Sequence, residues 1–392
     1  MTTSVDIVVV STACTTAINR NIYKEFIKLG MTVLLVVPKE LTVGSGSIKA
    51  DIPEIDDPMI EYMSLVGGNS RLFRFIGITK FLKLHRPKLI IVDNDPISLM
   101  ALQIGLWAKI FKSKIFCISC ENMSLGVFAS YRKRGLKGIF FTILKRIMMM
   151  ASRKLVNGIF TINNEGTNLF INEKFTNVKK IPLGFDPKYF QVNSNARKII
   201  RSKLRLDGFV VGFFGRIIHE KGIHILVEAL KSLKNYKWTL LMDEFNIYKN
   251  EFQKNIQNQI IQSGLINRVV SINPKHHEMG DFINSVDVVV MPSISTPFWI
   301  EQYGRIAAEA MGCGKLVVAS NSGALPMILN DYGILFKEGD VNQLTEILKN
   351  LIINKQSHKY SAKEISQHAF KELSIKKQMK VMLSLFKEMG TL

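Results

Sequence analysis

The sequence predicts an α/β protein made of two doubly wound, Rossmann-like domains. Short and almost continuously apolar runs alternate along the chain with longer segments that have the apolar spacing of helices. Such runs are typical of parallel strands that are buried on both faces. The pattern restarts at residues 208–215, after a segment rich in Pro, Asn and Ser. The 392 residues suffice for two domains of ordinary size.

The elements follow one another in the order that such a fold requires. In the first half, helices are expected at 17–30 and 98–111, between strands at 5–10, 32–37, 88–92, 114–119 and 158–162. In the second half, a helix is expected at 224–233, among strands at 208–215, 237–242, 269–273, 286–293, 315–320 and 333–336. An amphipathic helix, "FKELSIKKQMKVMLSLFKEM", closes the sequence.

The linker between the two halves, residues 181–204, contains Pro182 and Pro187. We therefore expect domains at residues 1–188 and 189–365 that face a cleft, followed by a terminal helical segment at 366–392. Open parallel sheets bind ligands at the carboxyl ends of their strands. The residues just after each strand are consequently the candidates for function.

The composition narrows the class of partner. The net charge is +20, which favours a negatively charged partner such as nucleic acid, an anionic membrane or a phosphorylated small molecule.

The four cysteines are scattered along the chain, as in proteins of a reducing compartment. The segment "CISC" at 117–120 is best interpreted as a buried strand, and the alternative is a metal or redox pair. No segment has the pattern of a signal peptide or a membrane span, so we expect a cytosolic protein or one at a membrane surface.

Two cations follow the first strand of the second half, in "GRIIHEKG". Arg216 can contact two phosphate oxygens at once, and Lys221 adds a mobile positive charge. A glycine turn with two cations at a strand end suits a diphosphate. The alternative is a pair of surface cations on a basic protein.

Two glutamates flank the start of a predicted helix further along the chain. Pro292 and Pro297 fix a non-helical loop, and the helix is expected to begin near Tyr303 or Gly304. Its free N–H groups would accept an anion. Glu301 and Glu309 would repel a phosphate, so we expect them to hold neutral hydroxyl groups, such as those of a sugar; for Glu309 the alternative is a solvated helix residue.

Together these motifs resemble the C-terminal domain of the GT-B glycosyltransferases of family 4, which are retaining enzymes that use nucleotide sugars. The resemblance rests on "IPLGFDPKYF", "GRIIHEKG", "MPSISTPFW", "EQYGRIAAEAMGCGKLVVASNSGALP" and "GILFKEGD". It covers about residues 180–392 by motif, and the remainder by topology alone. The chain departs from the family at Asp243 and Glu244, where members usually have a glycine-rich turn.

The resemblance implies roles for individual residues. Arg216 and Lys221 would bind the donor diphosphate and assist its departure, Glu301 would contact the hydroxyls of the donor sugar, and Glu309 would hold the ribose hydroxyls. Five further residues would lie along the diphosphate and sugar: Gly215, Gln302, Tyr303, Gly304 and Arg305. The implied reaction is a retaining, hexosyltransferase-like transfer without a metal or cofactor. The first domain would bind the acceptor, the second the nucleotide sugar, and the terminal helix would cross back to the first domain.

The acceptor side offers fewer signals. Glu121 and Asn122 follow a predicted strand, where Glu121 either positions or deprotonates the acceptor hydroxyl or forms a salt bridge. "VDNDP" at 92–96 has the Asp-x-Asp spacing of a metal site in another glycosyltransferase fold, which conflicts with a donor site in the second half. His276 and His277 are better interpreted as contacts to the nucleobase than as metal ligands.

A basic and apolar segment follows. From Asn122 to Asn164 there is no acidic residue, and cations alternate with Phe, Ile, Leu and Met. Such a segment suits the headgroups of an anionic bilayer, although a core helix with a solvated basic rim would have the same pattern. The proposed membrane patch consists of Arg132, Lys133, Arg134, Lys137, Lys145 and Arg146.

The sequence therefore predicts a glycosyltransferase that moves a sugar from a nucleotide sugar to a glycan or lipid-linked acceptor in surface polysaccharide or glycolipid synthesis. We expect it in the cytoplasm, peripheral on the inner face of the cell membrane, and without a nucleic-acid partner. The alternatives are a sugar-nucleotide epimerase of the same fold, a basic nucleic-acid-binding protein and a non-catalytic scaffold.

Overall fold

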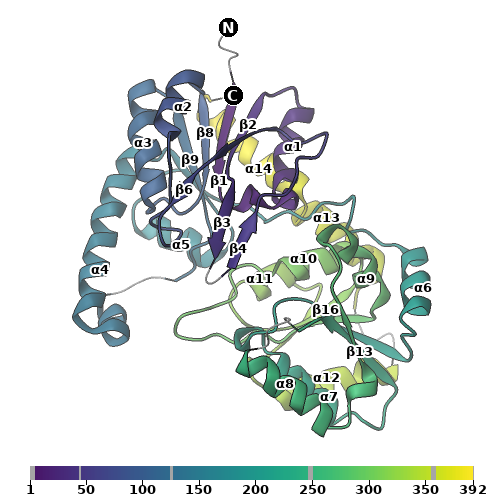
Figure 1. Cartoon of the computed structure of the whole chain (residues 1–392). Helices are drawn as coiled ribbons and strands as arrows, with labels where there is room; N and C mark the ends of the chain where they lie inside the picture. The colour runs from purple at the N-terminus through teal and green to yellow at the C-terminus, as the bar shows by residue number, and fades with distance from the viewer. Residues whose placement is uncertain (1–4, 44–45, 124–126, 246–249, 355–358, 392) are drawn as a thin grey trace. The chain divides into compact units, whose positions relative to one another are not determined.

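The computed structural model describes residues 5–43, 46–123, 127–245, 250–354 and 359–391; of these, the side chains of 42, 43, 46, 127–134, 136–138 and 141 lie outside the description. The chain folds into two compact units (Figure 1). Unit 1 joins the residues up to Pro182 with those from Ile375 onward, and unit 2 is Leu183–Ser374.

Unit 1 is built on a parallel sheet in the order β11-β10-β9-β8-β1-β2-β5. Its strands are β1 (Ile7–Ser11), β2 (Val33–Pro38), β5 (Met59–Met63), β8 (Leu89–Asp93), β9 (Lys114–Ser119), β10 (Gly158–Thr161) and β11 (Val178–Lys180). Two small antiparallel pairs lie outside it: β3 (Glu40–Val43) with β4 (Gly46–Lys49), and β6 (Leu65–Val66) with β7 (Arg74–Phe75). The order of the sheet reverses between β1 and β8.

Helices cover both faces of this sheet, as Figure 1 shows. They are η1 (Ala13–Thr15), η2 (Ala17–Arg20), α1 (Asn21–Lys28), α2 (Ile78–His85), α3 (Leu99–Phe111), α4 (Val127–Leu155, kinked at Gly135), α5 (Asn164–Asn172) and α14 (Ile375–Glu388). On one face, Val8 and Val92 pack with buried residues of α2, α3 and α4. On the other, Phe386 of α14 contacts the rings of Phe26, Phe116 and Phe160. Burial on both faces explains why the central strands are continuously apolar.

Unit 2 is built on a parallel sheet in the order β14-β13-β12-β15-β16-β17. Its strands are β12 (Phe209–Phe213), β13 (Trp238–Asp243), β14 (Val269–Ile272), β15 (Val288–Met291), β16 (Leu316–Ser320) and β17 (Ile334–Phe336). Numbered within the unit, this is the order 3-2-1-4-5-6 of a nucleotide-binding doubly wound sheet. The order reverses between β12 and β15.

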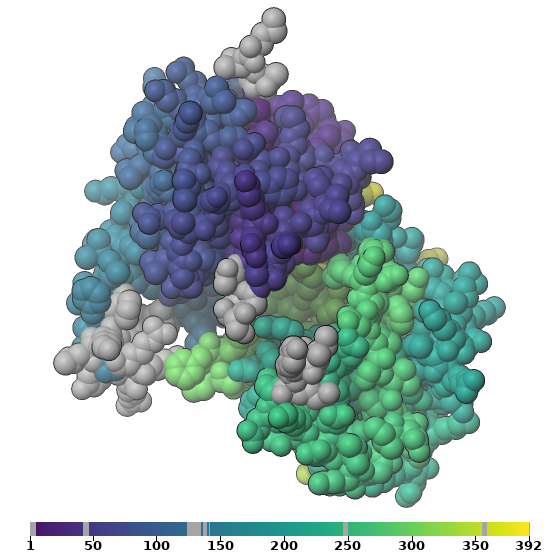
Figure 2. Space-filling model, in the orientation of Figure 1, coloured from purple at the N-terminus to yellow at the C-terminus, as the bar shows by residue number. Residues whose placement is uncertain are grey.

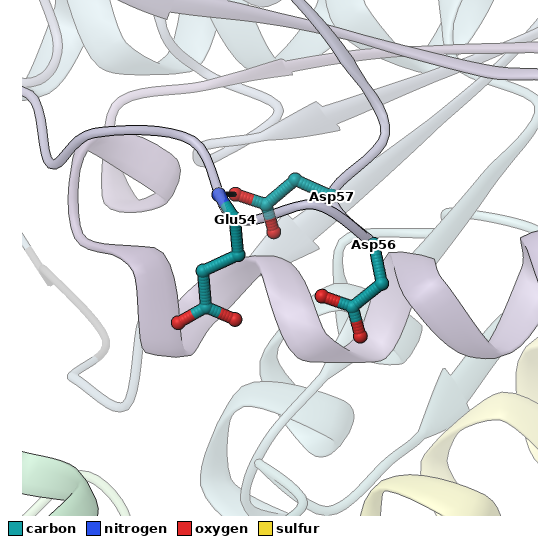
Figure 3. Close-up of side chains that lie close together, drawn as sticks. All are labelled: Glu54, Asp56 and Asp57. Atoms are coloured by element: carbon teal, nitrogen blue, oxygen red, sulfur yellow. Dashed lines mark hydrogen bonds between the residues drawn. The ribbon is translucent and has the colours of Figure 1, made fainter.

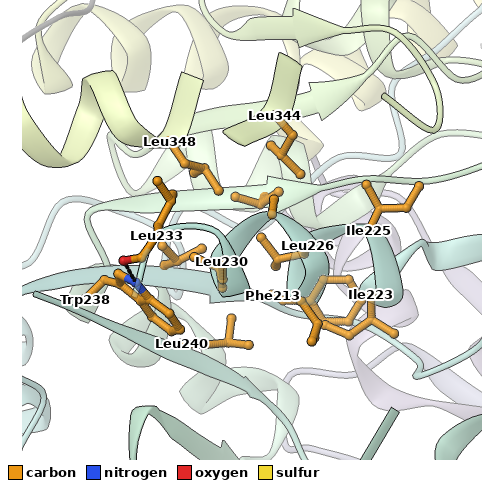
Figure 4. Close-up of a cluster of buried hydrophobic side chains, with 14 of the residues drawn as sticks. Phe213, Ile223, Ile225, Leu226, Leu230, Leu233, Trp238, Leu240, Leu344 and Leu348 are labelled. Atoms are coloured by element: carbon orange, nitrogen blue, oxygen red, sulfur yellow. Dashed lines mark hydrogen bonds between the residues drawn. The ribbon is translucent and has the colours of Figure 1, made fainter. Parts of the chain in front are cut away.

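The helices of unit 2 bury a large apolar core against this sheet. They are α6 (Ser194–Lys203), η3 (His219–Lys221), α7 (Ile223–Lys231), α8 (Glu251–Gln262), η4 (Ile266–Arg268), η5 (His276–Glu278), α9 (Met279–Ser285), α10 (Arg305–Gly312), α11 (Leu325–Leu329), α12 (Val341–Asn354) and α13 (Ala362–Glu372). Figure 4 shows Leu226 and Leu230 of α7 packed among Phe213, Leu240 and Leu344. This core fixes β12 and α7, and with them the loop that joins the two.

The predicted fold class, two doubly wound sheets with a helix that returns to the first of them, is confirmed. The units divide after Pro182 and Ser374, whereas the predicted boundaries lay at 188/189 and 365/366. The reason is that Phe185 belongs to unit 2, where its N–H donates to the carbonyl of Leu373. The single terminal helix that we predicted is two helices, α13 and α14, and α10 begins at Arg305.

In the described part of the chain, no helix is both long and apolar enough to cross a bilayer.

Candidate functional site

The point at which the strand order of unit 2 reverses brings two loops together. The loop after β12 carries Gly215, Arg216 and Lys221, and the loop after β15 runs from Pro292 to Gly304. A doubly wound sheet opens a crevice at such a point, outside the carboxyl ends of its strands. The fold thus places most of the residues predicted for the donor at one edge of the sheet.

Lys221 and Glu301 form an ion pair across this edge. The Nζ atom of Lys221 lies 2.6 Å from Oε2 of Glu301, and Ser293 donates a hydrogen bond of 3.0 Å to the same oxygen. Lys221 also lies over the ring of Trp299, 5.2 Å from its centre. The side chain of Glu301 is 7% exposed and that of Lys221 is 20% exposed. Charged groups so far removed from water interact strongly with a bound ligand.

The backbone fixes the position of Lys221. Lys221 ends the short helix η3, and Gly222 follows with a φ of +70°. A Cβ atom on Gly222 would lie 1.8 Å from the carbonyl oxygen of Pro292, so the two loops touch through backbone atoms. This contact fixes the distance between the residues after β12 and those after β15.

Helix α10 begins at the same edge. Gly304 is its N-cap, and Arg305 is its first residue. Tyr303 is buried, whereas Gln302 is exposed and Arg305 is half-buried. The ring of Tyr303 therefore packs in the interior, and only its backbone remains for a ligand at the N-terminus of α10.

Glu309 lies one turn into α10 and is buried, with 1% of its side chain exposed. Its Oε1 atom is 3.3 Å from Nε2 of His276, which η5 presents after β14. Its Oε2 atom is buried without a hydrogen-bond partner among the described residues. Buried acceptors are normally satisfied, so this oxygen is suited to a donor group from a ligand. His276, which we had interpreted as a contact to the nucleobase, lies against Glu309.

Two carboxylates that were not predicted as site residues also act at this edge. Asp243, at the end of β13, accepts a hydrogen bond of 2.7 Å from the N–H of Gly215. Burial raises the pKa of Asp243 to about 6, the Gly215 N–H lowers it, and Glu244 raises it. Glu338, after β17, accepts hydrogen bonds from the N–H and the hydroxyl of Ser295 and so ties down the loop after β15.

In unit 1, a second polar cluster follows the ends of β1, β8 and β9. Ser11 donates to Asp93 at 2.7 Å, and Ser119 donates to Asp95. Each aspartate of the Asp-x-Asp spacing thus accepts a hydrogen bond from a different serine. Burial raises the pKa of Asp95.

Glu121 lies beside this cluster and forms salt bridges with Arg71 at 2.7 Å and Lys145 at 3.4 Å. Of the two roles considered for Glu121, the structure therefore contains the salt bridge. Asn122, its neighbour, is half-buried.

The predicted membrane patch is wrong at Lys145. The side chain is only 11% exposed, points to Glu121, and has its pKa lowered mainly by burial. Arg146 is exposed. The side chains of Arg132, Lys133, Arg134 and Lys137 lie outside the described residues.

One group of three carboxylates in the described part of the chain is close enough to share a cation: Glu54, Asp56 and Asp57 (Figure 3). The Nζ atom of Lys24 already lies 2.6 to 3.2 Å from all three, and Arg20 binds Asp57 at 2.8 Å. The side chains of this chain thus supply the positive charge that the cluster attracts.

Residues 195–369 match the family model described as Glycosyl transferases group 1. This segment is thus similar to the group 1 glycosyltransferases. It includes every residue of unit 2 discussed above for the predicted donor site, from Gly215 to Glu338.

Curated glycosyltransferases are also similar to this chain. D-inositol 3-phosphate glycosyltransferase of Paenarthrobacter aurescens is 30% identical over 193 residues, which are 48% of this chain and 46% of the relative. The capsular polysaccharide biosynthesis glycosyltransferase CapM of Staphylococcus aureus is 26% identical over 56% of this chain and 57% of its own. Lipopolysaccharide 1,2-N-acetylglucosaminetransferase of Salmonella typhimurium is 26% identical over 46% of this chain and 53% of its own. The chain thus spans about half the length of the curated relatives it matches.

Solved structures resemble the whole chain. HepE of Anabaena, in complex with UDP and glucose, superposes with a TM-score of 0.72 at 19% identity, over 99% of this chain and 100% of that one. WaaG, a glycosyltransferase of lipopolysaccharide biosynthesis, superposes with a TM-score of 0.65 at 13% identity, over 98% of this chain and 100% of that one. At these identities the likeness concerns the fold. It identifies the GT-B fold, as predicted.

Several contacts in unit 2 were beyond sequence reasoning. Asp243 was noticed only as a departure from the family's glycine-rich turn, and Ser293 and Glu338 only as parts of longer motifs. The partners of Asp243 and Glu338 lie 28 and 43 positions away in the sequence. The signal that could have found these three residues is their common place at or just after the end of a predicted strand.

Proposed function

We propose that this protein is a glycosyltransferase that moves a sugar from a nucleoside diphosphate sugar to a glycan or lipid-linked acceptor in surface polysaccharide or glycolipid synthesis. The observation that carries the proposal is the Lys221–Glu301 pair at the point of strand reversal, inside the segment that matches the group 1 glycosyltransferases. The similarity to CapM, of capsular polysaccharide biosynthesis, and to the Salmonella lipopolysaccharide transferase supports this class of pathway.

In the proposed reaction the bond from the anomeric carbon to the diphosphate breaks. The acceptor hydroxyl oxygen forms the new bond to that carbon, and its proton passes to the departing diphosphate. Negative charge grows on the departing diphosphate, and Arg216, Lys221 and the first N–H groups of α10 would stabilise it. Fixed cations can do this without a metal ion, so we propose a metal-independent transfer. We propose retention of configuration from the resemblance to family 4.

The two glutamates would bind neutral hydroxyl groups. Glu301 would accept from the donor sugar while it keeps Lys221 in place, and Glu309 would accept from the ribose with its unpartnered Oε2 atom. A ligand hydroxyl would satisfy a buried acceptor that the described residues leave without a hydrogen bond.

A donor panel tests this proposal. The panel contains UDP-, GDP- and ADP-sugars, and we expect the sugars of one of these nucleotides to raise the melting temperature of the protein. A donor at a concentration about one hundred times its Kd adds about 2.7 kcal/mol to the free energy of unfolding. Glu309→Gln should lower the affinity for that donor by about tenfold, which corresponds to the loss of one hydrogen bond to a charged group. The same donor should release its nucleoside diphosphate when an acceptor is added.

The outcomes are separable. If all three donors leave both proteins unchanged, the donor proposal fails. If the variant binds its donor like the wild type, the ribose role of Glu309 alone is wrong.

We also propose that unit 1 binds an anionic membrane, through an apolar surface that keeps Arg146 of the predicted patch and leaves out Lys145. Large apolar side chains form a stripe on α4 and continue on α3, which packs against α4. In Figure 2 the blue and teal atoms of this part of unit 1 lie at the surface of the molecule. The stripe comprises Phe140, Ile143, Leu144, Ile147 and Met150 on α4, with Leu106 and Ile110 on α3; these side chains are 42–65% exposed. Arg146, Arg153 and Lys154 are exposed on the same helix, and no acidic residue lies between Asn122 and Asn164. An apolar stripe with a basic rim suits a bilayer of anionic lipids.

Vesicle flotation tests the stripe. The double variant Ile143→Ser and Ile147→Ser should reduce binding to phosphatidylcholine vesicles that contain phosphatidylglycerol by at least about tenfold, because each isoleucine carries on the order of 1.5 kcal/mol or more of apolar burial. The matched control is Ile199→Ser with Ile266→Ser, two equally exposed isoleucines of unit 2. Equal flotation of the two double variants would contradict the proposal.

A further inference from the structure

The loop after β12 leaves room for a ligand beside Gly215. This residue directly precedes Arg216, has a φ of +142°, and has no atom within 4 Å of the position that a Cβ atom would take. Its N–H group lies at the carboxyl edge of the sheet, where such groups commonly bind phosphate. On geometry alone, Gly215 and Arg216 would offer one binding surface to an anion.

The N–H of Gly215 already donates a hydrogen bond within the protein. Oδ2 of Asp243 accepts its hydrogen bond at 2.7 Å. A carboxylate oxygen and a phosphate oxygen satisfy such an N–H in the same way, so one N–H group cannot serve both with full strength. A charged Asp243 would also repel a diphosphate at this edge.

The surroundings of Asp243 raise the pKa of its carboxyl group, so that it takes up a proton at mildly acidic pH. Burial raises the pKa of its carboxyl to about 6, the Gly215 N–H lowers the pKa, and Glu244, the adjacent acidic residue, raises it. Glu244 accepts a hydrogen bond from the side chain of Asn273 after β14, and the loop after β12 contributes the neutral N–H of Gly215. The folded-state pKa is thus above the ordinary value, so the carboxyl becomes neutral as pH falls through about 6.

We propose that Asp243 sets the affinity for the donor by competing with its diphosphate for the N–H of Gly215. The inference rests on the proposed function, because it needs a nucleotide sugar bound at Arg216 and Lys221. Binding then requires that Asp243 moves away or takes up a proton. A protonated Asp243 no longer repels the diphosphate and can itself donate a hydrogen bond to it.

The test is calorimetric titration of UDP-glucose, GDP-mannose and ADP-glucose into the wild type, Asp243→Asn and Glu244→Gln, at pH 7.5 and 5.5. Asparagine keeps an oxygen for the Gly215 N–H and removes the charge. We expect the wild type to bind its donor roughly three- to tenfold more tightly at pH 5.5 than at pH 7.5. Asp243→Asn should bind at pH 7.5 as the wild type binds at pH 5.5, while Glu244→Gln should remain closer to the wild type.

Proton counting adds a second readout. In buffers of different ionisation enthalpy at pH 6.5, the wild type should take up protons as it binds the donor, and Asp243→Asn should take up fewer. Histidines of unit 2 can also exchange protons, and the variant separates their share from that of Asp243.

The outcomes distinguish a failure of this inference from a failure of the proposed function. Weaker or unchanged donor binding by Asp243→Asn at pH 7.5, with its melting temperature preserved, overturns the inference and leaves the proposed function intact. A wild type and a variant that bind none of the three donors at either pH overturn both.

Discussion

Lys221→Met should lower the kcat of sugar transfer by roughly 10²–10³-fold. The ammonium group is the positive charge next to Glu301, and we propose that it stabilises the charge that grows on the departing diphosphate. Because that charge grows in the transition state, kcat should fall more than the affinity for the donor. The measurement is steady-state kinetics with the donor identified by the panel, together with the Kd of the same donor.

A matched variant controls for the loss of a lysine in the same unit. Lys231→Met removes a lysine of α7 that pairs with Glu228 at 3.1 Å on the surface. Its kcat should stay within about twofold of the wild type, since exposed pairs contribute little. The double variant Lys221→Met with Glu301→Gln should be about as slow as the slower single variant, because the two side chains are in contact. A kcat for Lys221→Met within threefold of the wild type would refute the role of Lys221.

Gly222→Ala should destabilise unit 2 by about 2–4 kcal/mol. A Cβ atom at this position would lie 1.8 Å from the carbonyl oxygen of Pro292, in a backbone with a φ of +70°. One of the two loops must therefore move, and the distance between Lys221 and the loop after β15 changes. Urea denaturation followed by circular dichroism measures the loss.

The control is Gly264→Ala, at another positive φ, +66°, with no atom within 4 Å of the added carbon. It should cost about 1 kcal/mol, the strain of the left-handed backbone alone. If Gly222→Ala is no less stable than Gly264→Ala, the contact between the two loops does not matter for stability.

How much of the fold could be predicted depended on how completely each strand is buried. Central strands such as β8 and β15 are buried on both faces, and their apolar runs were recognised in the sequence. The edge strands β5 and β11 were missed, because β5 alternates between exposed and half-buried residues and β11 is Val-Lys-Lys. An edge strand is paired on one side only and needs no continuous apolar run, so its sequence carries a weaker signal.

For the site, the sequence indicated which residues gather but not which of them touch. Lys221 and Glu301 were assigned separate roles, and only the fold places them 2.6 Å apart. Lys145 was assigned to a membrane surface because its neighbours in the sequence are basic and apolar, yet its partner Glu121 lies on a different element. Local pattern predicts the direction of a side chain only where one face of a helix is clearly apolar.

The return of α14 to unit 1 has a consequence for the order in which this protein is completed during synthesis. Unit 2 is one continuous stretch of chain, so all of it has been made before α14 emerges from the ribosome. Unit 1 must wait for Phe386, which packs against Phe26, Phe116 and Phe160. The usual order, in which the N-terminal domain finishes first, is thus reversed, and the aromatic face of the first sheet stays uncovered until α14 has been synthesised.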